Sequence, residues 1–254
     1  MGPTNTMTNL VLHLSLTSPQ RTWLLLLLIL WGALLFGGFL LGTPDARRTR
    51  RMPLWTRIAS SVALVVAGWS WWLFTRDTAV GGYALLIAAG MSFGLLGDLA
   101  MAKLLPVGNH VAAGIASFGI GHVLYIVAMV GYGNQTGLDD ATARWASLAV
   151  WWLIGLGGWW WFVYRGQKAT PLHWAALLYA LLLASTTGFA TSLAVQDTSF
   201  VLLVVGAALF LISDMVLAGE LFSGLHFPYI GDVVWLTYGP GQMLIVYSVG
   251  VMLT

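Results

Sequence analysis

The chain has 254 residues, of which 59% are hydrophobic and only 8% are charged. A soluble globular domain carries about 25% charged residues, so this composition predicts an integral membrane protein. The formal net charge of +2 is too small to indicate a nucleic-acid partner. The sequence has no cysteine, which excludes disulfides, thiolate metal sites and cysteine nucleophiles.

Eight apolar stretches reach roughly the 20 residues that a helix needs to cross a bilayer. Several of them begin or end beside a proline, which is typical of helix termini. We therefore expect an all-α, polytopic membrane bundle of eight helices, forming one membrane domain over 22–254 after a polar tail over 1–21. The expected spans are 22–42, 58–74, 80–105, 109–131, 145–163, 171–194, 199–219 and 229–253.

Basic residues are concentrated in the loop after the first expected span, and the positive-inside rule places such a loop in the cytoplasm. Alternation of the spans then assigns eight basic residues to the inside and three to the outside. We expect a multi-pass protein of the cell membrane with both termini outside. The inside residues are Arg47, Arg48, Arg50, Arg51, Arg57, Lys103, Arg165 and Lys168, and the outside residues are Arg21, Arg76 and Arg144.

Two aspartates lie within the apolar stretches, Asp98 in the third and Asp214 in the seventh. An ionisable group at bilayer depth costs about 2.5–3.5 kcal/mol on insertion scales, so its presence indicates a functional site. The two surroundings share the pattern Leu-[Leu/Ile]-[Gly/Ser]-Asp-[Leu/Met]-x-x-Ala. Matching contexts favour a paired site, whereas the alternative is that each carboxyl group only bonds a neighbouring helix and orients packing.

An internal repeat is indicated by the spacing of these motifs. The aspartates are 116 residues apart, which spans four helices, and in the next span of each half His122 pairs with Gln242 at a spacing of 120. We infer parallel halves over 22–131 and 145–253, related by a pseudo-two-fold axis along the membrane normal. Both aspartates then lie five to seven residues from the cytoplasmic ends of their expected spans, in a cavity open to that side.

Two carboxyl groups in a low-dielectric cavity cannot both ionise easily, because burial and mutual repulsion oppose the second charge. We expect one protonated acid and one carboxylate, which is the pairing that concerted acid/base catalysis needs. Such a pair serves reactions with an oxocarbenium-like intermediate, as in glycoside hydrolysis. Asp98 and Asp214 are therefore the predicted catalytic residues, with their individual roles left open.

Four further polar groups are predicted to bind substrate beside the aspartates: His122, Tyr125, Tyr238 and Gln242. Tyr125 follows His122 by three positions and Tyr238 precedes Gln242 by four, so each pair shares a helix face. The alternatives are a core histidine and tyrosines that only pack. Metal binding by His122 with the two aspartates is a further alternative, but no His-x-x-x-His pair is present, and we predict neither metal nor cofactor.

Three other features of the sequence lead to structural predictions. Pro240 and its two flanking glycines are expected to loosen or kink the last span and so widen the cavity. Glu220, Asp232 and Asp197 lie near span ends and are expected to be solvated. The tryptophan-rich fifth span is expected to face lipid.

Four short motifs, taken together in order and spacing, match a known family: Gly97-Asp98, Gly121-His122-x-x-Tyr125, Ser213-Asp214-x-x-Leu217-Ala218 and Tyr238-x-x-x-Gln242. Over the third to eighth spans the chain resembles the YhhN-type lysoplasmalogenase family. The resemblance implies an eight-helix membrane hydrolase that cleaves the vinyl-ether bond of lysoplasmalogens to a fatty aldehyde and a glycerophospho-base. It also implies that Asp98 and Asp214 correspond to the two membrane aspartates proposed as catalytic in the family.

The expected partner is a lysophospholipid from the membrane, whose phosphate meets Lys103, Arg165 or Lys168, although membrane topology alone explains these cations. A proton-coupled transporter or lipid carrier is the main alternative, because parallel repeats and polar residues within spans are typical of transporters. An intramembrane aspartyl protease and a non-enzymatic binding protein are two others. The sequence does not specify an oligomeric state or a headgroup preference.

Overall fold

The computed structural model describes residues 16–253, and these residues form helices and loops without a strand. Eight of the described helical segments are long and apolar enough to cross a membrane. The predicted all-α fold of an integral membrane protein is thereby confirmed. The helices are α2 (Ser18–Leu41), α3 (Leu54–Thr75), α4 (Gly81–Met101), α5 (His110–Thr136), α6 (Ala141–Trp159), α7 (Pro171–Gln196), α8 (Val201–Phe222) and α9 (Ile230–Tyr247), with the short segments η1 (Trp160–Tyr164), η2 (Thr198–Phe200) and η3 (Ser248–Leu253).

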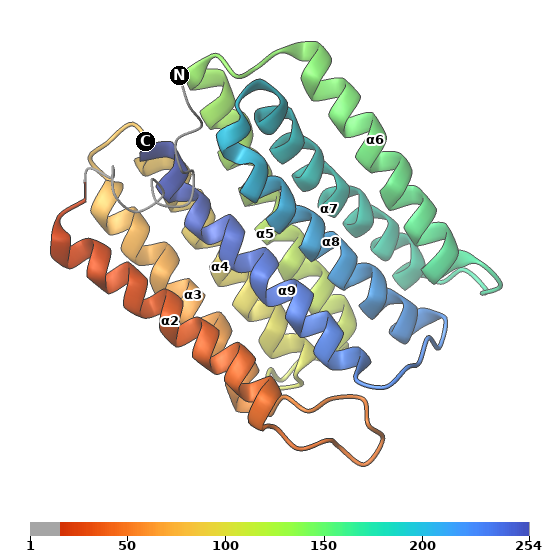
Figure 1. Cartoon of the computed structure of the whole chain (residues 1–254). Helices are drawn as coiled ribbons and strands as arrows, with labels where there is room; N and C mark the ends of the chain where they lie inside the picture. Colours follow the sequence, from red (N-terminus) through yellow and green to blue (C-terminus); the bar gives the residue numbers. More distant parts are fainter. Residues whose placement is uncertain (1–15, 254) are drawn as a thin grey trace.

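The helices run alternately up and down, with α2 and α6 at opposite edges of the bundle (Figure 1). The loops 42–53, 102–109, 165–170 and 223–229 gather at one end, which we call the basic end because it carries most of the arginine and lysine residues (Figure 1). Most of the expected tail over 1–21 lies outside the described residues, and α2 already begins at Ser18.

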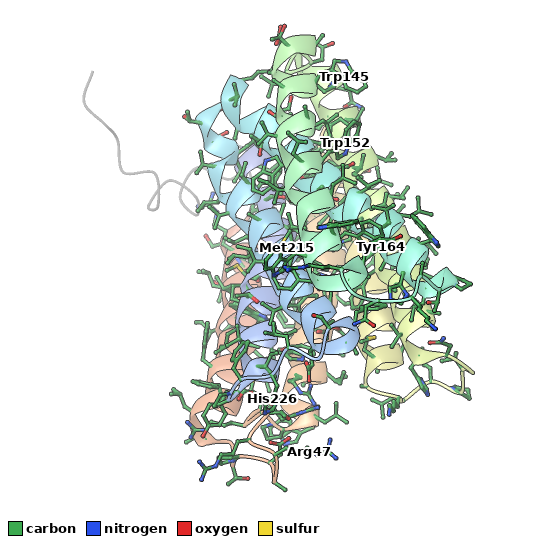
Figure 2. All side chains as sticks on the ribbon, turned by 90° about the vertical axis from the view of Figure 1, so that its right-hand side faces the viewer. Arg47, Trp145, Trp152, Tyr164, Met215 and His226 are labelled. Carbon is green, nitrogen blue, oxygen red and sulfur yellow. The ribbon has the colours of Figure 1, made fainter. Side chains whose placement is uncertain are left out.

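The outer surface of the bundle is apolar, as expected for contact with lipid. Exposed fractions reach 88% for Leu41 on α2 and 72% for Leu153 on α6. Soluble monomers rarely expose apolar patches of this extent. Among the eight spans α6 is the least buried, and Figure 2 shows Trp145 and Trp152 along its length. The fifth span therefore faces outward along most of its length, as predicted.

Close glycine contacts join α4 to α5 and α8 to α9. A Cβ atom added at Gly121 would lie 2.9 Å from the carbonyl oxygen of Gly90, and one added at Gly241 would lie 2.8 Å from that of Gly206. The two contacts are offset by 116 and 120 residues, which are the offsets of the aspartate pair and of the pair His122 and Gln242. The internal repeat stays a prediction, and these contacts agree with it.

Helix α9 continues without a break through Pro240. A Cβ atom added at Gly239 would lie 2.7 Å from Cδ2 of Leu35 on α2, while Gly241 contacts α8. Its glycines are used for close packing against two neighbouring helices, and the expected widening of the cavity by this segment stays a prediction.

Helix α4 ends at Met101, earlier than expected, and Lys103 then adopts a left-handed backbone conformation with φ of 60°. Asp98 therefore lies three residues before the end of its helix, whereas Asp214 lies eight residues before the end of α8. At 1.5 Å of rise per residue these distances are about 4.5 and 12 Å. The expected distances of five to seven residues from the helix ends were wrong for this reason.

Replacement of Gly121 by Ala should destabilise the protein by about 1–3 kcal/mol, because the new methyl group meets the backbone of α4 and the helices must separate. Gly131→Ala is the matched control on the same helix, since nothing lies within 4 Å of its added Cβ atom. The melting temperatures of both variants are measured by thermal unfolding in detergent. Equal melting temperatures for the two variants would contradict the close approach of α4 and α5.

Candidate active site

A cavity of about 340 Å³ at the basic end is lined by both Asp98 and Asp214. Its walls come from α3, α4, α5, α8, α9 and the adjoining loops. The two carboxyl groups are close enough for their charges to interact. The structure thus brings together the two aspartates that the sequence predicted as a pair, from helices far apart in the chain.

Asp98 is almost fully buried, with an exposed fraction of 5%. Its Oδ2 atom accepts hydrogen bonds from the Ser61 hydroxyl on α3 at 2.5 Å and from the Tyr238 hydroxyl on α9 at 3.0 Å. A buried carboxyl group needs such partners, because its desolvation is otherwise uncompensated. Asp98 therefore connects α4 to two other helices as well as facing the cavity.

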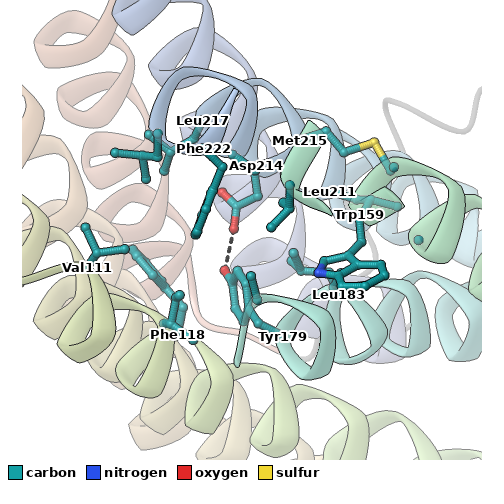
Figure 3. Close-up of a pocket in the computed structure, with 18 of the residues that line it drawn as sticks. Val111, Phe118, Trp159, Tyr179, Leu183, Leu211, Asp214, Met215, Leu217 and Phe222 are labelled. Carbon is teal, nitrogen blue, oxygen red and sulfur yellow. Dashed lines mark hydrogen bonds between the residues drawn. The ribbon is translucent and has the colours of Figure 1, made fainter. Parts of the chain in front are cut away.

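Asp214 has a different environment. Its Oδ2 atom accepts a hydrogen bond from the Tyr179 hydroxyl on α7 (Figure 3). Among the described residues, this is its one side-chain hydrogen bond. Phe118 stands 120 residues before Tyr238 and also lines the cavity, but it has no hydroxyl group to donate. The two carboxyl groups are thus unequal, with two hydroxyl donors at Asp98 and one at Asp214.

A second, narrow cavity of about 70 Å³ adjoins the first at Asp214, which lines both. We call it the apolar branch. It lies between α5, α7 and α8, with the end of α6 and η1 as its outer wall. Figure 3 shows Val111 and Phe118 on one side and Trp159 and Met215 on the other. Apart from Asp214 and the polar tips of Tyr179 and Trp159, its lining is apolar; it includes Ile115, Gly158, Val163, Leu183, Leu211 and Phe222.

The wall segment η1 is a π-helix that continues from α6. Single π-helical turns within α-helices are rare and occur frequently at functional sites. Val163 of this turn is buried and faces the apolar branch, whereas Trp160 and Trp161 on the same turn are exposed. Trp159, just before it, lines the branch and donates its Nε1–H to the carbonyl oxygen of His173 at 2.8 Å. This end of the tryptophan-rich helix therefore faces inward as well as outward.

A chain of hydrogen bonds extends behind Asp98. The Tyr125 hydroxyl donates to Oε1 of Gln242 at 2.9 Å, and Nε2 of Gln242 donates to the Tyr238 hydroxyl at 3.3 Å. Tyr238 then donates to Asp98. Of these three predicted substrate-binding residues, only Tyr238 lines the cavity. Tyr125 and Gln242 orient Tyr238 from the protein interior.

Three glycines on one face of α4 accommodate this arrangement, since spacings of four and three residues place them in line. A Cβ atom added at any of them would lie 2.4–2.7 Å from a side chain packed on it. The pairs are Gly90 with Tyr125, Gly94 with Gln242 and Gly97 with Phe118.

His122 lies away from both cavities. Its Nδ1 atom is 2.9 Å from the Thr186 hydroxyl, which itself donates to the carbonyl oxygen of Leu182 at 3.0 Å, so Nδ1 is the donor. Its buried Nε2 atom has no hydrogen-bond partner among the described residues. Within residues 16–253 no group of three His, Asp or Glu side chains gathers as metal ligands. The substrate-binding roles of His122, Tyr125 and Gln242 stay predictions.

Asp232 is buried, with an exposed fraction of 1%, so the expectation that it is solvated was wrong. Its carboxylate accepts hydrogen bonds from the backbone amides of Arg51 at 2.6 Å and Met52 at 3.0 Å. Backbone amides that are removed from water need an acceptor, and Asp232 supplies one from the start of α9. The loop 42–53 is thereby tied to α9 at the edge of the cavity.

The same loop is folded by Asp45. The hydroxyl and the amide of Thr49 each donate to its carboxylate at 2.6 Å, and these bonds hold the pKa of Asp45 below its usual range. The loop therefore has a defined shape, which places Arg50 in the lining of the cavity.

Sequence reasoning missed several residues of the site. Ser61 and Tyr179 donate hydrogen bonds to the aspartates. Both are polar residues within apolar spans, and such residues are candidates for hydrogen bonds between helices. Glu220, which was expected to be solvated, is half-buried and contributes to the cavity lining. Of the three cations considered for phosphate, Lys103 lines the cavity, whereas Arg165 and Lys168 are exposed outside it.

The fold and the cavity define a class of protein: an eight-span helical membrane protein with two carboxyl groups in one cavity at the basic end. The sequence profile of the YhhN family matches residues 52–249, and the chain belongs to this family. The predicted family resemblance is thereby confirmed. No curated protein and no solved structure matches the chain.

Replacement of Tyr238 by Phe removes a hydrogen bond to Asp98 and the acceptor for Gln242. The free energy of unfolding should fall by about 1 kcal/mol, because two buried polar groups lose a partner. Tyr164→Phe is the control, since the hydroxyl group of Tyr164 makes no hydrogen bond to the described residues. Unfolding in detergent compares the two, and an unchanged stability for Tyr238→Phe would contradict the hydrogen-bonded chain.

Proposed function

We propose that the protein is a lysoplasmalogenase-type hydrolase that cleaves the vinyl-ether bond of a single-chain lysophospholipid. The products are a fatty aldehyde and a glycerophospho-base. One observation carries the proposal: Asp214 lies where the cavity that it shares with Asp98 meets the apolar branch. Membership of the YhhN family is consistent with a hydrolase of this kind.

The two cavities suit the two parts of such a lipid. In this proposal the apolar branch, with a volume of about 70 Å³, takes the part of the hydrocarbon chain next to the vinyl ether, and the larger cavity takes the glycerol and headgroup. With the chain in the branch, the vinyl-ether bond lies at the junction beside Asp214. By the positive-inside rule we place the basic end in the cytoplasm of a cell, so that substrate enters from the inner leaflet.

The reaction begins when a carboxylic acid gives its proton to the outer alkene carbon, which leaves an oxocarbenium ion at the carbon bonded to oxygen. A water molecule adds to this carbon and passes a proton to the second carboxylate. The resulting hemiacetal collapses: its hydroxyl proton leaves, the carbon–oxygen bond to glycerol breaks, and the glycerol oxygen takes up a proton. One water molecule is consumed, and the pair recovers its single proton.

The surroundings of the two aspartates favour one division of these roles. Asp214 faces the apolar branch, where the alkene lies, so it is placed to donate the first proton. Asp98 accepts hydrogen bonds from Ser61 and Tyr238, which hold its carboxylate as an acceptor in the polar cavity where water has access. We therefore assign the acid role to Asp214 and the base role to Asp98.

Purified protein should release aldehyde from a lysoplasmalogen and leave the saturated alkyl-ether analogue intact, because only the alkene accepts the proton. Asp98→Asn and Asp214→Asn should each lower the rate by about 100- to 10,000-fold, the usual contribution of general acid/base catalysis. Asp77→Asn, at an exposed surface pair with Arg76, is the control. Full turnover by either cavity variant would refute the paired mechanism, and binding without cleavage by folded wild-type protein would favour a lipid carrier.

The apolar branch should set the chain length of the substrate. In Gly158→Val the added atoms meet the flexible end of Met215, whose Cε atom would lie 2.6 Å from a Cβ atom, and both side chains then fill the branch. Relative kcat/KM should shift toward shorter chains. Gly157→Val has the same helix propensity, but its side chain enters open space on the outer face. A parallel shift in both variants would show that the branch does not hold the chain.

A further inference from the structure

We propose that Arg57 and Lys103, assisted by Arg50, form a phosphate-binding subsite at the mouth of the cavity. The ligand is the phosphate diester of a single-chain lipid headgroup. This proposal rests on the proposed function for the identity of the lipid, and on the cavity lining for the subsite itself.

The three cations reach one cavity from three different segments. Arg50 comes from the loop 42–53, Arg57 from the first turn of α3 and Lys103 from the segment after α4. Membrane topology accounts for cations at the basic end, but it does not require them to converge. Arg47 lies at the same end (Figure 2) and is exposed, but it is not part of the cavity lining.

Arg57 has an incomplete set of partners. Its guanidinium group lies over the ring of Trp235, 5.4 Å from the ring centroid, and its buried Nε atom has no hydrogen-bond partner among the described residues. No carboxylate in the described part of the chain lies within 4 Å of it, since the ion pairs found there join Arg50 to Asp45 and Arg76 to Asp77. Asp232 and Asp98 attract its charge from a greater distance, but neither pairs directly with it. A partly buried guanidinium group without a direct ion pair is costly, and a phosphate matches its planar set of donors.

Lys103 occupies a backbone position that favours glycine. With φ of 60°, its amide donates to the carbonyl oxygen of Ala100 at 2.9 Å and closes the end of α4. Glycine is the usual residue at such a left-handed helix end, because a side chain is disfavoured there. Lys103 lines the cavity and is exposed there, although its backbone conformation disfavours a side chain. Retention of a residue with a side chain at a strained backbone position is common at functional sites.

Two acidic residues of the lining, Asp214 and Glu220, come from α8. Asp98 comes from α4 and lies near enough to Arg57 for their charges to attract, although the two groups form no ion pair within 4 Å. The cations come from α3, the loop before it and the segment after α4, so we place the phosphate on that side of the cavity. A lipid held in this way has its phosphate at the mouth, its glycerol beside the aspartates and its chain in the apolar branch.

The test is binding of a non-cleavable alkyl-ether lysophospholipid to the purified full chain, compared with the alkylglycerol that lacks phosphate. Arg57→Gln and Lys103→Gly should each weaken phospholipid binding about 10- to 100-fold, the loss expected for a charge-assisted contact. Binding of the alkylglycerol should not change. Lys103→Gly should also keep or raise the melting temperature, because glycine fits the left-handed backbone.

Lys168→Gln and Arg47→Gln are the matched controls, since they remove a positive charge from the basic end outside the cavity. Arg57→Lys should recover part of the lost affinity by restoring the charge without the planar donors. If the control variants lost as much affinity for the phospholipid as Arg57→Gln and Lys103→Gly do, the subsite would be overturned. The same holds if Arg57→Gln and Lys103→Gly weakened binding of the alkylglycerol as much as binding of the phospholipid. Binding of inorganic phosphate by wild-type protein, without binding of the lysophospholipid, would overturn the lipid assignment.

The hydrolase proposal and the phosphate-subsite proposal can be refuted independently of each other. Phosphate-dependent lipid binding without cleavage of lysoplasmalogen would remove the hydrolase proposal and support the subsite. Cleavage with equal kcat/KM for phospholipid and alkenylglycerol in all variants would support the hydrolase and remove the subsite.

Discussion

The hydrogen bond from Tyr238 to Asp98 joins the last helix of the bundle to the helix that carries the first carboxyl group. Its geometry depends on Gln242, which is held by Tyr125 and packs on Gly94 of α4. Within apolar surroundings these polar groups have few other partners, so each bond fixes the rotation of a helix about its axis. The cavity exists because the helices meet in this rotation, with one carboxyl group supported by hydroxyl donors and the other beside an apolar channel.

The difference between Tyr238 and Phe118 makes the surroundings of the two aspartates unequal. The predicted repeat relates these two positions, and only Tyr238 carries a hydroxyl group. If the two halves descend from one ancestor, the loss or gain of this hydroxyl group is one of the changes that made the surroundings of the two carboxyl groups unequal, together with the different donors Ser61 and Tyr179. Burial and repulsion leave one proton on such a pair, and the inequality decides which carboxyl group carries it.

The sequence was sufficient to predict the spans and the paired aspartates, because hydropathy over about 20 residues and an ionisable residue within such a stretch are local signals. The hydroxyl donors Ser61 and Tyr179 were not predicted, since partners across helices depend on how each helix is rotated. The burial of Asp232 was missed for a similar reason. An acidic residue at a helix start is usually solvated, and only the docking of a loop about 180 residues earlier in the chain removes it from water.

The π-helical turn at Trp160–Tyr164 gives one wall of the apolar branch one residue more than an α-helical turn would hold. Such a turn absorbs the extra residue locally, so the positions before and after it keep their orientation. Loss of one residue from the turn would restore α-helical geometry and change only which side chain of the turn faces the branch, where Val163 now lies. An evolving lineage can therefore remodel this channel through a single codon deletion, while every residue around the two carboxyl groups stays the same.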